Sequence, residues 1–168
     1  MDERSFNNRL FYTIRTHISS AQEELNILQR LNATYQSRLS ELNSYRRQLL
    51  FSSSEDDAIA KLVLLVNEIE VLRNRLDASK NHLSALLSAA LSYLVMIAEN
   101  SQDTQSPSMV RVRNEVRAIT RIVEGGKGLN VDYSALVAVA ARGAVIMGLK
   151  VNGEITRRLF VALKNTVL

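Results

Sequence analysis

Apolar residues recur every three or four positions along two long stretches of this chain, and this pattern predicts two long helices. The first series runs from Phe11 to Leu49 and the second from Ala58 to Ile97. In both series the spacing alternates between 3 and 4 residues, which is the heptad pattern of a coiled-coil seam. Neither stretch contains Gly or Pro, so the sequence gives no reason for either helix to break.

The two series are out of phase by two residues, which indicates a chain reversal between them. Continuing the first series would place seam positions at Ser53 and Ala60, whereas the second series uses Ala58 and Leu62. A continuous coiled coil absorbs insertions of three or four residues, but not of two. Ser54 and the acidic residues after it are typical of a helix N-terminus. The sequence therefore predicts an antiparallel hairpin with helices over about residues 3–51 and 55–99.

Polar residues within the two seams predict how the hairpin is aligned. One antiparallel register brings Asn32 and Ser79 into the same layer, and it also brings the small residues Ala21 and Ala90 together. A register shifted by one heptad would instead place Asn32 against Leu72. Because an unpartnered buried amide costs about 1–3 kcal/mol, we expect the register that pairs Asn32 with Ser79.

Beyond residue 100 the sequence predicts three shorter helices. A polar linker over 101–107 ends in Ser106-Pro107, an N-cap followed by the proline that suits the first helical position. Asp132 is the expected N-cap of the second short helix. The three helices are expected over about 107–123, 133–147 and 154–166, with Gly125-Gly126 ending the first and a chain turn at Asn152-Gly153 before the last. We therefore predict an all-α protein, with a hairpin over 1–100 and a three-helix domain over 108–168.

The predicted C-terminal domain is basic. Residues 106–168 hold 10 Lys and Arg against 4 Asp and Glu, whereas residues 1–105 hold 11 against 13. Arg113, Arg117 and Arg121 follow one another at four-residue intervals, about 6 Å apart along a helix, which is close to the spacing of backbone phosphates. The candidate polyanion-binding residues are Arg113, Arg117, Arg121, Arg157, Arg158 and Lys164. The alternatives are a solvated helix surface or a docking face for acidic residues of another subunit.

Two weaker motifs also lie in the basic region. Residues 144–159 are spaced like a helix-turn-helix around Gly148-Leu149, but Glu154 occupies the position where an apolar residue is required. A plain corner between packed helices is the alternative. Gly125-Gly126-Lys127-Gly128 lacks the Ser or Thr that follows Lys in a phosphate-binding loop, so we interpret it as a helix end and a connection. Aromatic residues are scarce here, so any nucleic-acid contact would be to the backbone.

No set of residues in the sequence is typical of catalysis or of a metal site. His17 and His82 each lie at the edge of a seam, far apart along the predicted hairpin, and so they cannot share a metal ion. The absence of Cys excludes disulfides and thiolate metal sites. No Ser–His–acid set or carboxylate pair in an apolar pocket can be assembled. We therefore expect a protein that is not an enzyme and binds no cofactor or metal.

The second long helix is more apolar than a two-stranded seam requires. Leu87, Leu91, Leu94 and Val95 lie outside the seam and form the candidate oligomer interface. Val63, Leu64, Val66 and Val71 also lie outside it. An exposed strip of this size would be an interaction site, and a compact three-helix domain is too short to cover arms about 65–70 Å long. The sequence therefore predicts a homo-oligomer, of which a dimeric four-helix bundle is the simplest form.

Three functions are compatible with this pattern. The first is a self-associating structural or assembly protein, such as a scaffold, filament or virion component. The second is an oligomeric nucleic-acid-associated protein that holds DNA or RNA backbone on its basic helices, and the third is a peripheral binder of anionic membranes. The polar N-terminus does not resemble a signal peptide, and the most apolar segment, 83–98, is too short to span a membrane. We therefore expect a soluble intracellular protein.

Overall fold

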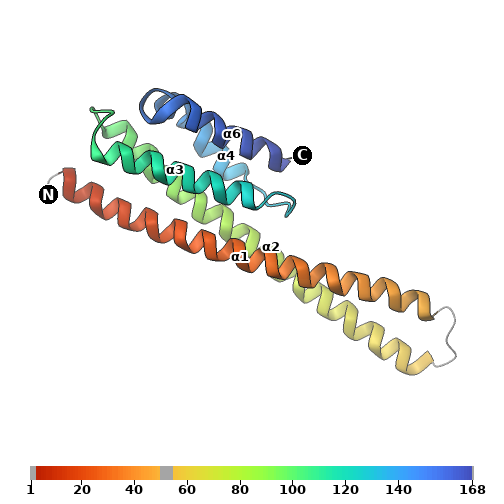
Figure 1. Ribbon diagram of the computed structural model, residues 1–168. Helices are drawn as coiled ribbons and strands as arrows, with labels where there is room; N and C mark the ends of the chain where they lie inside the picture. Colours follow the sequence, from red (N-terminus) through yellow and green to blue (C-terminus); the bar gives the residue numbers. More distant parts are fainter. Residues whose placement is uncertain (1–2, 50–54, 168) are drawn as a thin grey trace. The chain divides into compact units, whose positions relative to one another are not determined.

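The computed structural model describes residues 3–49 and 55–167, and within these residues every regular element is a helix (Figure 1). The two long helices pack against each other and shorter helices follow them, as the sequence predicts. The elements are α1 (Glu3–Leu49), α2 (Glu55–Asn100), α3 (Pro107–Gly125), α4 (Ser134–Arg142), α5 (Ala144–Ile146), the π-helix η1 (Met147–Asn152) and α6 (Gly153–Val167). The predicted all-α class and helical hairpin are therefore confirmed.

The chain forms two compact units, and their boundaries differ from the predicted domain boundary. The first unit comprises Met1–Leu25 and Lys80–Leu168, and the second comprises Asn26–Ser79. The C-terminal helices thus share a unit with residues of both long helices, because the apolar residues of α1 and α2 in that unit form part of the same core. The linker at 101–107 separates helices, but it does not separate compact units.

Contacts between α1 and α2 in the second unit confirm that the hairpin is antiparallel. Arg38 pairs with Glu68 at 2.8 Å, and the ammonium group of Lys61 lies 4.9 Å from the centre of the Tyr45 ring. Residue numbers therefore rise along one helix as they fall along the other. The seam of α2 is buried as predicted at Ala58, Leu65, Ile69, Leu72 and Leu76.

The structure tests neither the predicted pairing of Asn32 with Ser79 nor the predicted N-cap at Ser54. Asn32 is half-buried on α1 and Ser79 is buried on α2, and their pairing stays a prediction. The proposed N-cap Ser54 lies outside the described residues.

Gly143 interrupts the helix that the sequence predicts over 133–147. α4 ends at Arg142, and the chain bends by 60° between the segments Ser134–Arg142 and Ala144–Thr166. A Cβ atom at Gly143 would lie 2.6 Å from Cγ2 of Val95 on α2, closer than side chains tolerate. The single long helix was therefore a wrong prediction, and the close approach of the backbone to Val95 requires glycine at this bend.

The turn predicted at Asn152-Gly153 is also wrong, because the chain stays helical there. η1 runs directly into α6, and Gly153 has ordinary helical backbone angles. The side-chain oxygen of Asn152 accepts hydrogen bonds from the backbone N–H groups of Glu154 and Ile155, as a helix cap does. The pattern Asn152-Gly153 therefore indicates a helix cap and not a reversal of the chain. The helix-turn-helix interpretation fails for the same reason, since Gly148-Leu149 lies inside η1.

The predicted N-cap at Ser106 is confirmed, whereas the one at Asp132 is a residue too early. Ser106 accepts a hydrogen bond from the backbone N–H of Met109 at 3.3 Å, and Pro107 opens α3. α4 begins at Ser134 with Tyr133 in the N-cap position, and Asp132 accepts a hydrogen bond from the N–H of Ser134 at 2.9 Å, which lowers the pKa of its carboxyl group. The predicted inner positions of α3 are all buried: Met109, Val112, Val116, Ile119 and Val123. Local capping chemistry and apolar spacing thus define α3 from the sequence.

Among the described residues, α2 is the one helix that is long and apolar enough by itself to cross a membrane. The relevant window of Asp56–Asn100 has a mean hydropathy of 1.5, and 39% of it is buried inside the protein. The bent pair around Gly143 meets the same criterion only when its two parts are taken together. Core helices of soluble proteins also meet it. The expected soluble intracellular location stays a prediction.

Candidate functional site

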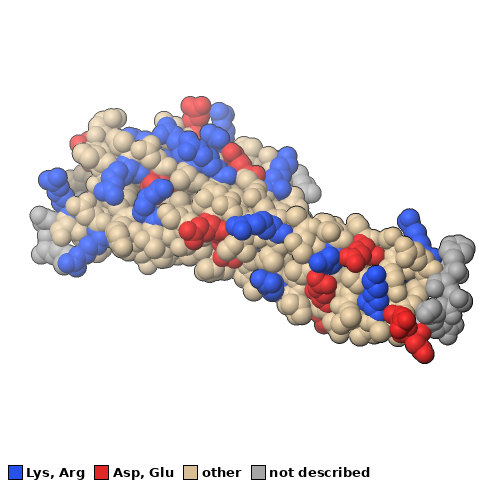
Figure 2. All heavy atoms as spheres, turned by 60° about the horizontal axis from the view of Figure 1, so that its bottom comes forward, with Lys and Arg blue, Asp and Glu red and all other residues tan. Residues whose placement is uncertain are grey.

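Basic side chains gather over the C-terminal helices. Figure 2 shows Lys and Arg side chains grouped there, with fewer Asp and Glu side chains between them. The six candidate polyanion-binding residues all lie on α3 and α6. Their surroundings decide which of them are free to bind a ligand.

Arg113 points inward and holds the backbone. Its guanidinium group donates hydrogen bonds to the carbonyl oxygens of Thr104 in the linker and of Lys150 and Val151 in η1. Because these carbonyls engage its Nε and Nη2 groups and the side chain is half-buried, Arg113 is a structural residue, and its place in the candidate polyanion-binding set is corrected. The four-residue spacing of the arginines could not reveal this, since the carbonyls lie up to 38 positions away in the sequence.

Lys150 strengthens the same junction, although sequence reasoning did not identify it. Its ammonium group donates to the carbonyl oxygens of Glu99, at 3.3 Å, and Ser101, at 2.6 Å, where α2 ends. The C-terminus of a helix carries unsatisfied carbonyls and partial negative charge, so cations are favourable there. Arg113 and Lys150 together join the end of α2, the linker and η1. We call these two side chains the junction cations.

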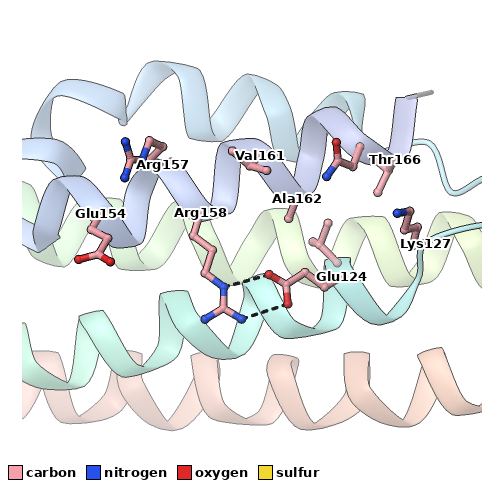
Figure 3. A pocket seen from close by; sticks show the side chains of 10 residues that line it. Glu124, Lys127, Glu154, Arg157, Arg158, Val161, Ala162 and Thr166 are labelled. Carbon is pink, nitrogen blue, oxygen red and sulfur yellow. Dashed lines mark hydrogen bonds and ion pairs between the residues drawn. The ribbon is translucent and has the colours of Figure 1, made fainter.

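A groove of about 560 Å³ lies between the side chains of α3 and α6 where the two helices pack together (Figure 3). Arg158 crosses it and donates two hydrogen bonds to the carboxylate of Glu124, at 3.0 and 3.2 Å, which raises the pKa of the guanidinium. Arg157 is exposed on the α6 side, while Glu154 and Lys127 lie toward opposite ends of the groove. Acidic and basic groups therefore alternate along the groove, and the basic residues are not concentrated at one point.

The remaining candidate cations lie in other places. Arg117 donates to the side-chain oxygen of Asn114 at 3.2 Å and lines a cavity of about 190 Å³ with Arg158 and Glu154. Arg121 lines a separate cavity of about 310 Å³ together with Arg15 of α1. Lys164 is exposed near the end of α6. The structure brings Arg117, Arg157 and Arg158 near one another, but it does not form one continuous face from all six residues.

The predicted oligomer interface on α2 is covered within one chain. Leu87 and Leu91 are 0% exposed and Leu94 is 1% exposed, while Val95 is partly exposed beside Gly143. They belong to the compact unit that contains the C-terminal helices. We therefore correct this prediction: Leu87, Leu91 and Leu94 form part of the core of a single chain and present no free surface to another copy, and Val95 is only partly exposed.

A different part of α2 leaves apolar side chains in solvent. In the second unit, five large residues are 45–69% exposed, namely Ile59, Val63, Leu64, Val66 and Val71. At about 100° per residue, they lie on the side of α2 that faces away from the buried seam. The sequence predicts four of them to lie outside the seam. Ile59 is the fifth, and the sequence pattern does not identify it. We call this surface the outer face of α2.

Tyr133 is the one described tyrosine whose pKa is strongly shifted. The side chain is 3% exposed, and its hydroxyl has no hydrogen-bond partner. Burial raises its pKa from 10.0 to about 12. A neutral, unpartnered phenol at physiological pH is a packing residue, since it neither donates a proton nor accepts one there.

This burial predicts a loss of stability at high pH. Above pH 10 the unfolded chain releases the Tyr133 proton while the folded chain retains it, so the free energy of unfolding is expected to fall between about pH 10 and pH 12, by about 2–3 kcal/mol in all. Tyr133→Phe should remove this loss, whereas Tyr12→Phe, at a position 77% exposed, should retain it. Urea unfolding at pH 9 and pH 11.5 measures the difference. Equal pH dependence in wild type and Tyr133→Phe would contradict the assignment.

The two histidines lie in separate environments. The ring of His17 meets the ring of Tyr93 edge-on with centroids 6.2 Å apart, and Nδ1 of His82 lies 3.2 Å from the carboxylate of Glu24. Across residues 3–49 and 55–167, no group of three or more His, Cys, Asp or Glu side chains is arranged to hold a metal ion.

No family model, curated protein or solved structure matches this chain. Its function must therefore be argued from its own surfaces. Two surfaces remain for that argument: the dispersed cations of α3 and α6, and the outer face of α2.

Proposed function

We propose that this protein is a non-enzymatic, self-associating structural or assembly protein that acts through helix docking. The observation that carries the proposal is the outer face of α2, where five large apolar side chains are 45–69% exposed within thirteen residues. Single exposed apolar residues are ordinary on protein surfaces, but a contiguous group on one helix face is typical of an interaction site.

The hairpin is suited to present such a face. Two long helices packed along a seam form a stiff element, and residues 26–49 of α1 alone extend about 35 Å at 1.5 Å per residue. Removing the apolar side chains from water would contribute about 25 cal/mol for each Å² that is buried. A stiff arm with an apolar side is suited to docking against another helix, a contact that a scaffold, a filament or a virion component requires.

Polyanion binding is the second candidate function, and the exposed cations Arg117, Arg121, Arg157 and Lys164 favour it. The same surface also contains Glu124 and Glu154, and Arg158 is already paired. We therefore rank this function below self-association. Peripheral membrane binding rests on these same cations and has no separate support.

Light scattering of the full chain at several concentrations tests the proposed function. The wild type is expected to exceed the monomer mass of 18.8 kDa as concentration rises. The double substitution Leu64→Gln and Val71→Gln should return the mass to that of the monomer, because it makes two exposed apolar positions polar. The melting temperature should change little, since neither side chain belongs to the core.

A matched control lies in the other compact unit. Val145 and Leu149 are 71% and 76% exposed, so Val145→Gln with Leu149→Gln makes the same chemical change elsewhere and should leave the oligomer intact. A wild type that is monomeric at every concentration would contradict the proposed function. An increase in mass only after DNA is added, reversed steeply by salt, would support the second candidate in its place.

A further inference from the structure

We infer that the outer face of α2 binds the same face of a second copy, with the two α2 helices antiparallel and related by a two-fold axis near the level of Leu65. This inference rests on the proposed function and names its partner. It follows from the order of apolar, small and charged residues along the described part of α2.

The midline of the outer face has its own heptad spacing. Positions 56, 60, 63, 67, 70 and 74 follow one another at intervals of 4 and 3, and all six side chains are exposed. In an antiparallel pair centred near position 65, Val63 lies opposite Asn67 of the second copy and the small Ala60 lies opposite the long Glu70. The long Glu70 side chain thus meets a small residue, while Val63 meets the polar Asn67, so the larger apolar contacts of this pair must come from the residues beside the midline.

Apolar residues flank this midline on both sides. Ile59 and Val66 lie along one side, and Leu64 and Val71 lie along the other. With the two-fold axis near Leu65, Ile59 lies on the same side of the interface as Val66 of the second copy, and Leu64 on the same side as Val71 of the second copy, each pair about 7–8 Å apart along the helices. The same surface therefore serves both partners, which is the property of a two-fold symmetric interface.

Charge decides between the antiparallel and parallel arrangements. Asp57 and Arg75 lie on the same side of α2, near opposite ends of the outer face, and both are exposed. An antiparallel pair brings Asp57 of each copy toward Arg75 of the other, whereas a parallel two-fold pair places these two residues on opposite sides of the interface and forms neither contact. A parallel pair would also place Glu70 against Glu70 on the midline, where repulsion disfavours association.

The same charges distinguish a second copy from an anionic membrane. Asp56, Asp57 and Glu70, on or beside the outer face, outnumber the flanking Arg73 and Arg75, so this surface disfavours a negatively charged lipid surface. A single contact between two helices lies at the low end of interface sizes, and we therefore expect association in the micromolar range.

Cysteine cross-linking tests the arrangement directly, because the natural sequence contains no Cys. Ala60→Cys and Glu70→Cys are made separately in the full chain, and each is oxidised alone and in an equimolar mixture. The antiparallel pair brings positions 60 and 70 of different copies together, while it separates 60 from 60 and 70 from 70 by about 15 Å. A disulfide-linked dimer is therefore expected only in the mixture, containing one chain of each variant.

A charge reversal provides an independent measurement. Arg75→Asp should weaken self-association about tenfold, since two acid–acid contacts then replace two ion pairs in each dimer. Adding Asp57→Lys to the same chain should restore most of the affinity by recreating opposite charges. Arg47→Asp, an exposed reversal on α1 away from the outer face, serves as the control.

The outcomes separate this inference from the proposed function. Disulfide formation by Ala60→Cys alone would indicate a parallel pair and overturn the inference. A protein that increases in mass with concentration but forms no cross-link in the mixture also overturns it, while the proposed function stands. A protein that remains monomeric overturns both.

Discussion

Replacing Arg113 with methionine is expected to lower the free energy of unfolding by about 2–4 kcal/mol. The guanidinium group donates to the carbonyl oxygens of Thr104, Lys150 and Val151, and methionine would leave these oxygens without a donor from this side chain. Hydrogen bonds from charged groups contribute about 1.5–3 kcal/mol each in favourable cases, and an unsatisfied buried carbonyl costs about 1–3 kcal/mol. Partial exposure of the site keeps the expected total below the sum of these contributions.

Thermal melting and urea unfolding measure this effect. For a chain of this size, each kcal/mol shifts the melting temperature by about 2–4 °C, so a decrease of about 5–15 °C is expected. Arg117→Met removes the same charge one helical turn away, where the partner is only the side chain of Asn114, and should change stability by less than about 0.5 kcal/mol. If both variants melt at the same temperature, Arg113 contributes nothing to stability and is again a candidate polyanion-binding residue.

Substituting Gly143 with alanine is expected to cost about 1–3 kcal/mol of stability. The added Cβ would lie 2.6 Å from Cγ2 and 3.1 Å from Cγ1 of Val95, and a β-branched side chain in a helix has little freedom to move aside. Relieving this overlap requires α4 to shift away from α2. The substitution therefore tests whether the bend at Gly143 holds the C-terminal helices in place.

A double substitution identifies the cause of that loss. Val95→Ala removes both clashing methyl groups, so Gly143→Ala should cost much less in a Val95→Ala background, with a coupling of about 0.5–3 kcal/mol in urea unfolding. Gly148→Ala is the matched control, because a Cβ there meets nothing within 4 Å. Additive losses in the double variant would show that the loss does not arise from the contact with Val95, since the lower backbone entropy of alanine would by itself stabilise the fold.

The sequence predicts the helices well because the forces that define them are local. The heptad spacing of α1 and α2, the capping of α3 by Ser106 and the phase change before Ala58 all depend on residues within a few positions of one another. Even the incorrect turn at Asn152 contains a correct signal, since that side chain does cap the N–H groups of α6. A cap shows where a helix can begin, but not whether the chain changes direction there.

The candidate sites were predicted less well, because exposure depends on elements that are distant in the sequence. Arg113 and Arg117 are spaced alike on α3, yet only Arg113 meets the carbonyls of η1. Leu91 and Leu64 are both surplus to the α2 seam, yet Leu91 is 0% exposed and Leu64 is 69% exposed. Periodicity identified apolar and basic residues that lie outside the seam, but it could not say which of them the chain itself would cover.

The amino-acid sequence alone therefore determined two long antiparallel helices, a reversal between them and a basic helical region after residue 106, because hydrogen bonding and apolar periodicity act over one or two helical turns. Only the tertiary structure decided that the chain bends at Gly143, that Arg113 is a junction cation and that the exposed apolar surface lies on the outer face of α2. These features depend on contacts such as that of Gly143 with Val95, which join separate helices through packing and cannot be read from the residues next to either position.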